Sequence, residues 1–208
     1  MRKLFDILKE ADAIHDGHFV LDNGKHLETF LSKDSLYPCA ELTAEAGEMM
    51  AEKVKNLDID VVVGTAWGAV ILCQWVAYYL SKIKGKAIYG VFTEKMSDKS
   101  QVFARGYEKY VKGKNVLVVE DWTSTGLSAL KTVNAVRENG GKVLGVSILI
   151  NRNPDEVTDE FFGAPIIPLE IYKAKRYDEK DCPMCKKGIP INTEYGIGKE
   201  YLLSRRKK

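Results

Sequence analysis

Two adjacent acids, Glu120 and Asp121, stand one residue before a turn of hydroxyl and glycine residues. The residues of this turn and of its helical continuation are Thr123, Ser124, Thr125, Gly126 and Ser128. Backbone N–H groups at the start of a helix have no partner within the helix, and the helix dipole adds positive potential, so such a turn can hold a phosphate. The acids are better suited to ribose hydroxyls, or to a magnesium ion approached through water. The pattern therefore predicts a ligand with both hydroxyls and phosphate, such as a sugar phosphate.

The elements that must position these groups follow from the apolar pattern. Val116–Val119 predicts a fully buried strand, and the helical pattern after the turn runs to about Glu138. Further strands are expected at residues 60–63, 87–92, 143–150 and 166–171, and further helices at residues 41–55 and 69–81. Strands that alternate with helices predict an α/β fold with a central, mainly parallel sheet flanked by helices and with ligands at the strands' carboxyl ends. A buried strand that ends in acids and a Ser/Thr helix cap, without a ligand, is the alternative.

A small lobe precedes this α/β pattern. Residues 2–14 predict an amphipathic helix, and the segments 18–21 and 26–31 flank Asn23-Gly24, a strong hairpin signal. We therefore expect three regions, which are an N-terminal helix and hood lobe (residues 1–38), a core domain (39–191) and a basic C-terminal tail of unknown role (192–208). The last four residues, 205–208, are expected to form a solvated, frayed end.

The overall composition narrows the class of function. The chain has 208 residues and a formal net charge of +2, which argues against an extended nucleic-acid or membrane surface. The longest apolar run, residues 69–80, contains Gln74 and is shorter than the about 20 residues that span a bilayer. Acids follow closely on the basic start, so we expect no signal segment and a cytoplasmic protein.

The four cysteines do not form a disulfide framework in a chain of this length. Cys73 lies in an apolar helical pattern and is expected in the core. Cys182 and Cys185 form a C-x-x-C pair, but a structural zinc site usually needs four ligands, and the histidines are far away in sequence. We interpret the pair as a structural turn, and half a zinc site, a redox pair and two plain thiols stay open.

The run from Val116 to Ser128 resembles the signature of the type I phosphoribosyltransferases, which bind 5-phosphoribosyl-1-diphosphate (PRPP). Trp122 stands where a small aliphatic residue is usual, and Ser124 where threonine is usual. In this family a glycine-bracketed loop cradles the pyrophosphate, and the matching loop here is Gly64–Ala69. The resemblance implies the type I phosphoribosyltransferase fold. Besides the acids and the turn, it assigns PRPP contacts to Thr65, Ala66, Trp67 and Gly68.

Other segments resemble the orotate branch of this family. Residues 17–26 follow that branch's hood, and Arg152 stands where its members carry a base-binding arginine. An arginine at the carboxyl end of a strand can clamp a carboxylate, whereas an exposed loop arginine is the alternative. Asn151 replaces the aspartate that usually precedes it. Because Asp22 lies where some members place an orotate-contacting lysine, Lys33 is a further candidate for contacting the base.

The long polar segment between the strands at 87–92 and 116–119 resembles the mobile loop of orotate phosphoribosyltransferases. In that branch the basic residues of the loop reach across a dimer and cover the pyrophosphate, and the resemblance gives Lys95 and Lys99 this role. Glu94 replaces an arginine that many members carry, and the loop's usual histidine has no obvious counterpart. The segment 182–190 is also similar to a tail in a bacterial and archaeal subset of these enzymes.

Taken together, the resemblances imply a glycosyltransferase of the pentosyl class. The reaction would be that of a magnesium-dependent orotate phosphoribosyltransferase, which converts orotate and PRPP to orotidine 5′-monophosphate and pyrophosphate in pyrimidine biosynthesis. The ion would be held by PRPP and water rather than directly by the protein. A homodimer with shared active sites is implied, without a nucleic-acid or membrane partner. The residues assigned to catalysis are Lys95, Lys99, Glu120 and Asp121.

Two alternatives stay open. The first is a phosphoribosyltransferase for another pyrimidine or a purine base, which Asp22 and Asn151 could permit. The second is a regulatory protein that binds PRPP without turnover, which Glu94 in the basic loop would fit. The intact acid pair is compatible with either.

Overall fold

The computed structural model describes residues 2–21 and 23–205, which fold into two compact units. The sheet unit is Cys39–Lys173. The terminal unit combines the described residues up to Pro38 with those from Ala174 onward. Residue 1, Asp22 and residues 206–208 lie outside the described residues, so the expectations for Asp22 and for most of the frayed end stay predictions.

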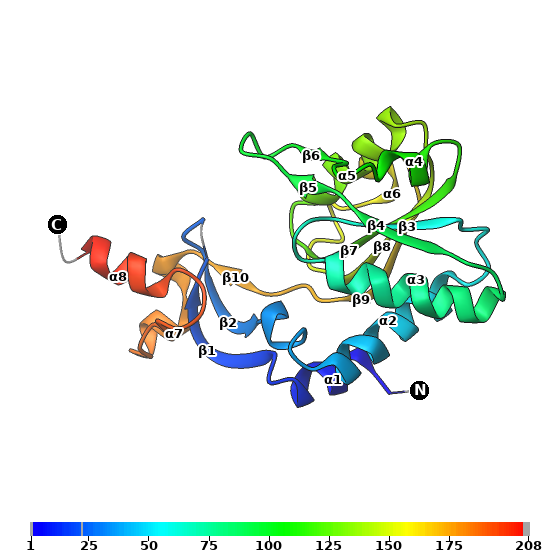
Figure 1. Cartoon of the computed structure of the whole chain (residues 1–208). Helices are drawn as coiled ribbons and strands as arrows, with labels where there is room; N and C mark the ends of the chain where they lie inside the picture. Colours follow the sequence, from blue (N-terminus) through cyan, green and yellow to red (C-terminus); the bar gives the residue numbers. More distant parts are fainter. Residues whose placement is uncertain (1, 22, 206–208) are drawn as a thin grey trace. The chain divides into compact units, whose positions relative to one another are not determined.

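In the described chain, five parallel strands form the centre of the sheet unit in the order β4-β3-β7-β8-β9 (Figure 1). They are β3 (Val61–Gly64), β4 (Tyr89–Phe92), β7 (Asn115–Thr123), β8 (Lys142–Asn151) and β9 (Ile166–Ile171). The predicted α/β fold with a mainly parallel sheet is confirmed. From β3 the chain moves to one edge of the sheet, and from β7 it moves to the other, so the order reverses between these two strands.

Helices cover both faces of this sheet. The crossover β3–α3–β4 and the crossover β7–α5–β8 move in opposite directions, with α3 at Val70–Lys84 and α5 at Leu127–Glu138. Because crossovers between parallel strands are right-handed, these two helices lie on opposite faces. Figure 1 shows α3 beside α2 (Ala40–Val54) on one face, and α5 with the short α6 (Asp159–Phe162) on the other.

The central strand β7 is longer than the sequence predicts. Its apolar run Val116–Val119 is fully buried, but the strand continues through both acids to Thr123. Pairing with β8 holds the extension, with Glu120 opposite Ile148 and Thr123 opposite Asn151. The acids therefore belong to the sheet and not to the turn, because β8 extends equally far beside them.

The helix α3 contains the longest apolar run of the sequence. Cys73 on this helix is fully buried, as predicted, and burial raises the pKa of its thiol to about 12. Gln74 is exposed and donates through Nε2 to the Gly90 carbonyl at 2.9 Å. None of the helices in the described part of the chain combines the length and the apolar character that a membrane crossing requires.

The polar segment between β4 and β7 has regular structure of its own. Two short strands, β5 (Glu94–Lys95) and β6 (Gln101–Val102), form an antiparallel hairpin, and α4 (Glu108–Val111) follows. The tip of the hairpin is closed by Met96 N, which donates to the Ser100 carbonyl at 3.0 Å. The candidate lysines of this segment therefore sit on a hairpin.

The terminal unit is built around the hairpin that Asn23-Gly24 predicts. β1 (Ile14–Val20) pairs with β2 (His26–Leu31), and β10 (Arg176–Tyr177) pairs with the other edge of β2. The remaining elements are α1 (Leu4–Glu10), η1 (Lys33–Ser35), η2 (Glu179–Asp181), α7 (Pro183–Lys186) and α8 (Gly198–Arg205). The first helix is shorter than the expected residues 2–14.

Residues after 173 group with the N-terminal hairpin, whereas the sequence predicts a core domain that runs to residue 191. The physical reason is hydrogen bonding to the hairpin, since Arg176 and Tyr177 of β10 pair with β2 and the Ile189 carbonyl accepts a hydrogen bond from His18 Nδ1 at 2.7 Å. Arg205, expected in a frayed end, instead closes α8 and forms an ion pair with Glu179 at 2.5 Å.

A substitution at Gly126, at the start of α5, tests how tightly this helix packs against α6. Its φ is 73°, and an added Cβ would come within 2.7 Å of the Phe161 ring. Gly126→Ala should lower the free energy of unfolding by about 3 kcal/mol, because left-handed backbone strain adds to overpacking. Gly85→Ala is the matched control: Gly85 has a φ of 63° but nothing within 4 Å of the added Cβ. The control should lose about 1 kcal/mol in urea unfolding, and equal losses would contradict a tight contact.

Candidate active site

Three chain segments leave the sheet side by side at its carboxyl edge. They follow β3, β7 and β8, which are neighbours in the sheet. Thr65 N donates to the Val119 carbonyl at 3.1 Å, so β3 and β7 stay paired beyond the end of β3. Arg152 N donates to the Thr123 carbonyl at 2.9 Å and joins β8 to β7 in the same way. The loop 64–69, the acids with their turn, and Arg152 thus meet where the strand order reverses, which is where α/β sheets bind ligands.

The acids Glu120 and Asp121 are 5% and 1% exposed. Successive side chains of a strand point to opposite faces, so Glu120 continues the row of Val116 and Val118, which belongs to the core cluster containing α5 residues. Asp121 faces the other side of the sheet. Each carboxylate accepts a backbone hydrogen bond, from Asp121 N at 3.1 Å and from Trp122 N at 2.5 Å. The pair therefore offers one acid on each side of β7.

Thr123 shapes the turn after β7. Its Oγ1 accepts a hydrogen bond from Gly126 N at 2.8 Å, and Gly126 adopts the left-handed conformation just before α5 begins. Ser124 is half-buried, whereas Thr125 and Ser128 are exposed. The N–H groups of the first turn of α5 have no acceptor within the helix. Together with the exposed hydroxyls they form a set of donors that suits a phosphate group.

The connection from β3 to α3 brings backbone and one hydroxyl to the same edge. A Cβ on Gly64 would lie 2.8 Å from a carbonyl oxygen of this loop, so only glycine fits. Thr65 and Ala66 are buried, Gly68 is half-buried and Trp67 is 64% exposed; the Ala66–Trp67 peptide bond is cis. The Thr65 Oγ1 atom is buried and has no hydrogen-bond partner among the described residues. A polar ligand at this loop would satisfy that hydroxyl.

The β5–β6 hairpin carries Lys95 and Lys99, and both side chains are exposed. Lys99 has a φ of 65°, and its carbonyl accepts a hydrogen bond from Lys131 Nζ at 2.7 Å. Glu94 accepts from Arg105 Nε at 2.6 Å. An exposed ion pair contributes little stability, but it holds the Arg105 guanidinium beside the position where the orotate branch usually has an arginine.

A buried polar network that the sequence does not reveal lies beneath this hairpin. Gln101 is 6% exposed, and its Nε2 donates to the Ala66 carbonyl at 3.1 Å. Its Oε1 accepts from Thr93 Oγ1 at 2.8 Å, and Thr93 Oγ1 lies 3.2 Å from Thr132 Oγ1 of α5. The network joins the hairpin to the 64–69 loop and to α5. No sequence signal marks Gln101, because a polar residue within a polar segment is the ordinary case.

Asn151, at the end of β8, has a role that aspartate could not fill. It is 2% exposed, and its Nδ2 donates to the Val157 carbonyl at 3.2 Å. Its Oδ1 accepts from Asn153 N at 3.0 Å, and Asn153 Nδ2 in turn donates to the Ser124 carbonyl at 3.0 Å. These bonds fasten the loop that carries Arg152 to the turn after β7. Arg152 itself is half-buried.

Two further groups of predicted residues belong to the terminal unit. Lys33 is half-buried in η1. Cys182 and Cys185 do not stand alone, contrary to the sequence-based interpretation, because the β1–β2 hairpin brings His18 and His26 beside them. One ligand atom from each of these four residues lies within 4.8 Å of all the others.

Residues 32–166 match a family model described as the phosphoribosyl transferase domain. This chain belongs to the phosphoribosyltransferase family. The matched segment includes all the predicted site residues, from Lys33 to Arg152. The type I phosphoribosyltransferase fold predicted from the acids and their turn is therefore confirmed.

This phosphoribosyltransferase is similar to orotate enzymes over most of its length. Over 189 residues it is 34% identical to the orotate phosphoribosyltransferase of Caldanaerobacter subterraneus subsp. tengcongensis. These residues cover 91% of this chain and 94% of that protein. The orotate phosphoribosyltransferase of Mycobacterium tuberculosis has a TM-score of 0.63 at 24% identity, over 80% of this chain and 96% of that one. The orotate phosphoribosyltransferase of Aeropyrum pernix has a TM-score of 0.62 at 20% identity, and the match covers 82% of this chain and 94% of that one. The predicted resemblance to the orotate branch is confirmed, and the two structures show the shared fold.

The Gln101 network is open to a direct test. Gln101→Ala should lower the free energy of unfolding by about 2 kcal/mol, because the buried Ala66 carbonyl loses its side-chain donor and the Thr93 hydroxyl loses one of its partners. Gln74→Ala is the matched control, since Gln74 makes one hydrogen bond at the exposed surface, where water can replace the partner. The control should lose less than about 1 kcal/mol in urea unfolding. A Gln101→Ala loss no larger than that of Gln74→Ala would contradict the network's structural role.

Proposed function

We propose that this phosphoribosyltransferase acts on orotate and PRPP and produces orotidine 5′-monophosphate and pyrophosphate. The observation that carries the proposal is the 34% identity, over 91% of this chain, to a protein named orotate phosphoribosyltransferase. The product is a precursor of uridine monophosphate, so the proposed reaction belongs to pyrimidine biosynthesis.

The reaction exchanges one bond at the anomeric carbon of the ribose for another. A ring nitrogen of orotate loses its proton to solvent and forms a bond to this carbon while the bond to the pyrophosphate oxygen breaks, and the bonding electrons leave with pyrophosphate. Positive, oxocarbenium-like charge develops on the ribose as the leaving group departs. Orientation of the two substrates and stabilisation of these charges are then the contributions that the protein must make.

The groups at the carboxyl edge match the parts of PRPP. The turn Thr123–Gly126 and Ser128 would bind the 5′-phosphate through N–H groups and hydroxyls. Glu120 and Asp121 would accept hydrogen bonds from ribose hydroxyls and stand near the developing positive charge. The backbone of the 64–69 loop, with the unpaired Thr65 hydroxyl, would face the pyrophosphate. This division assigns the acids to the ribose and leaves the phosphate groups to segments without acidic side chains.

Oxygen groups at this edge also fit magnesium. The carboxylates of Glu120 and Asp121 and the nearby hydroxyls are the hard oxygen donors that Mg²⁺ prefers, and this ion usually retains several waters. Glu120 and Asp121 would hold the ion near PRPP through such waters. Bound there, Mg²⁺ supplies positive charge that neutralises the leaving pyrophosphate.

The carboxylate of orotate needs a cation, and Arg152 is the first candidate. It follows β8 at the same edge as the acids and the turn, and its loop is fastened to that turn through Asn151 and Asn153. A guanidinium can bind a carboxylate with two parallel hydrogen bonds. Lys33 of the terminal unit is the second candidate for contacting the base.

The lysines of the hairpin would cover the pyrophosphate. Lys95 and Lys99 are exposed, and Gln101 anchors the hairpin that carries them. In a homodimer with shared sites they would reach the neighbouring subunit's pyrophosphate and exclude water that would otherwise hydrolyse PRPP. Arg105 forms an ion pair with Glu94, so the charges of these two residues cancel and the lysines carry the positive charge of the hairpin.

Asn151 does not by itself point to another base. Its amide group donates to the Val157 carbonyl within the loop, which accounts for the change from aspartate. Neither alternative function has a structural observation of its own, whereas the orotate proposal has a relative that matches over most of the chain.

The proposal is tested by the loss of orotate absorbance with purified protein, Mg²⁺ and PRPP. Orotate should be consumed only when PRPP is present, and chelation of Mg²⁺ should stop the reaction. Lys95→Ala should lower kcat/KM by about 100-fold, because it removes a positive charge from the transition state. Lys142→Ala is the matched control, since Lys142 is an exposed lysine at the amino end of β8, at the opposite edge of the sheet.

Orotate that stays unconsumed while the protein binds PRPP would refute the orotate activity. The same assay with other pyrimidines and purines would then separate a different base from a binding-only protein. Equal activity of Lys95→Ala and Lys142→Ala would refute the role of the hairpin lysine alone.

A further inference from the structure

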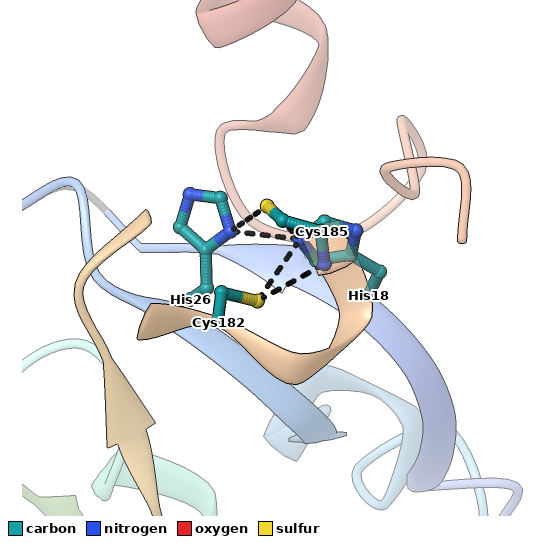
Figure 2. Close-up of side chains that lie close together, drawn as sticks. All are labelled: His18, His26, Cys182 and Cys185. Atoms are coloured by element: carbon teal, nitrogen blue, oxygen red, sulfur yellow. Dashed lines mark hydrogen bonds between the residues drawn. The ribbon is translucent and has the colours of Figure 1, made fainter. Parts of the chain in front are cut away.

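The terminal unit contains a compact cluster of two imidazoles and two thiols, shown in Figure 2. His18 comes from β1, His26 from β2, and Cys182 and Cys185 from the segment around α7. In Figure 2 the four side chains converge on one point between the hairpin and this segment. His18, His26 and Cys182 are at most 2% exposed, and Cys185 is half-buried. None of these side chains has a role in the proposed transfer reaction.

Three sulfur-to-nitrogen distances within the cluster are those of a tetrahedral metal site. The Sγ atoms of Cys182 and Cys185 lie 3.7 and 3.6 Å from His18 Nε2, and Cys185 Sγ lies 3.4 Å from His26 Nδ1. Zinc bonds of about 2.3 Å to sulfur and about 2.05 Å to nitrogen, at tetrahedral angles, place sulfur and nitrogen about 3.6 Å apart. The two ring nitrogens are 2.7 Å apart. They would separate by roughly 0.6 Å on coordination, a shift within reach of side-chain rotation.

Hydrogen bonds around the cluster orient the donor atoms. His18 Nδ1 lies 2.7 Å from the Ile189 carbonyl and must carry the proton that it donates. Its Nε2 is then the unprotonated nitrogen, and it faces the two sulfurs. A backbone acceptor on the second ring nitrogen is the usual arrangement behind a metal-bound histidine. Cys185 N donates to Cys182 Sγ at 3.5 Å, so this sulfur also has a backbone partner.

We propose that His18, His26, Cys182 and Cys185 form a structural zinc site. Two sulfurs and two nitrogens in tetrahedral arrangement are typical of Zn²⁺, and four protein ligands leave no open position for catalysis. The site joins the β1–β2 hairpin to a segment that is 164 residues away in sequence, as measured from His18 to Cys182. The unit has a short third strand, β10, of two residues, so a metal crosslink supplies stability that a small core provides poorly.

The test is the metal content of the full chain, which does not depend on the transferase activity. Protein saturated with zinc chloride and freed of excess metal should retain about one zinc per chain by mass spectrometry. The double variant Cys182→Ser with Cys185→Ser should retain only traces. Cys39→Ser is the matched control, because Cys39 is a free cysteine outside the cluster, and this variant should keep the metal.

Cobalt substitution of the wild-type chain keeps the test valid if the double variant does not fold. A tetrahedral Co²⁺ spectrum with sulfur-to-metal charge transfer is expected, and an octahedral spectrum without it would overturn the proposal. Wild-type protein that retains no zinc would also overturn it, as would a double variant that retains a full equivalent. A Cys182–Cys185 disulfide in metal-free protein purified without reductant would favour a redox pair instead.

Discussion

The pairing of β7 between β3 and β8 is the interaction on which the sheet unit depends. The apolar run Val116–Val119 is buried, and its backbone is bonded on both sides, so the strand has one register. That register decides which groups meet at the carboxyl edge. A slip by one residue would exchange the faces of Glu120 and Asp121 and would separate the turn from Arg152. The polar groups of the site are thus positioned by apolar residues behind them.

A second level of order couples the segments that surround this edge. Gln101 bonds to the Ala66 carbonyl and to Thr93, which reaches α5 through Thr132. Asn153 bonds to the Ser124 carbonyl from the opposite side. Buried polar groups stabilise only when their partners are all present, so these bonds specify the relative positions of the loops more than they add stability. Catalysis that relies on the orientation of the substrates needs loops in well-defined relative positions.

Helices and strands with a clear hydrophobic period could be predicted from the sequence. The acids and the turn could be predicted as well, because the strand, the acids and the hydroxyls follow one another closely along the chain. The extension of β7 through Trp122 could not, since acids in mid-strand contradict the usual pattern, and only pairing with β8 accounts for them. Gln101 could not be found either, because its partners Ala66 and Thr93 come from two other segments. The clearest failure is the C-x-x-C pair. No histidine or other cysteine lies near this pair in the sequence, but folding places His18 and His26 beside it.

A crystal structure of the chain with orotidine 5′-monophosphate bound is the measurement that bears most directly on the carboxyl-edge site. The expected result places the phosphate against the N–H groups and hydroxyls of the turn Thr123–Gly126, and the ribose hydroxyls against Glu120 and Asp121. The carboxylate of the base is expected at Arg152. A nucleotide bound elsewhere, or one whose ribose lies away from both acids, would contradict the assignment of this edge as the active site.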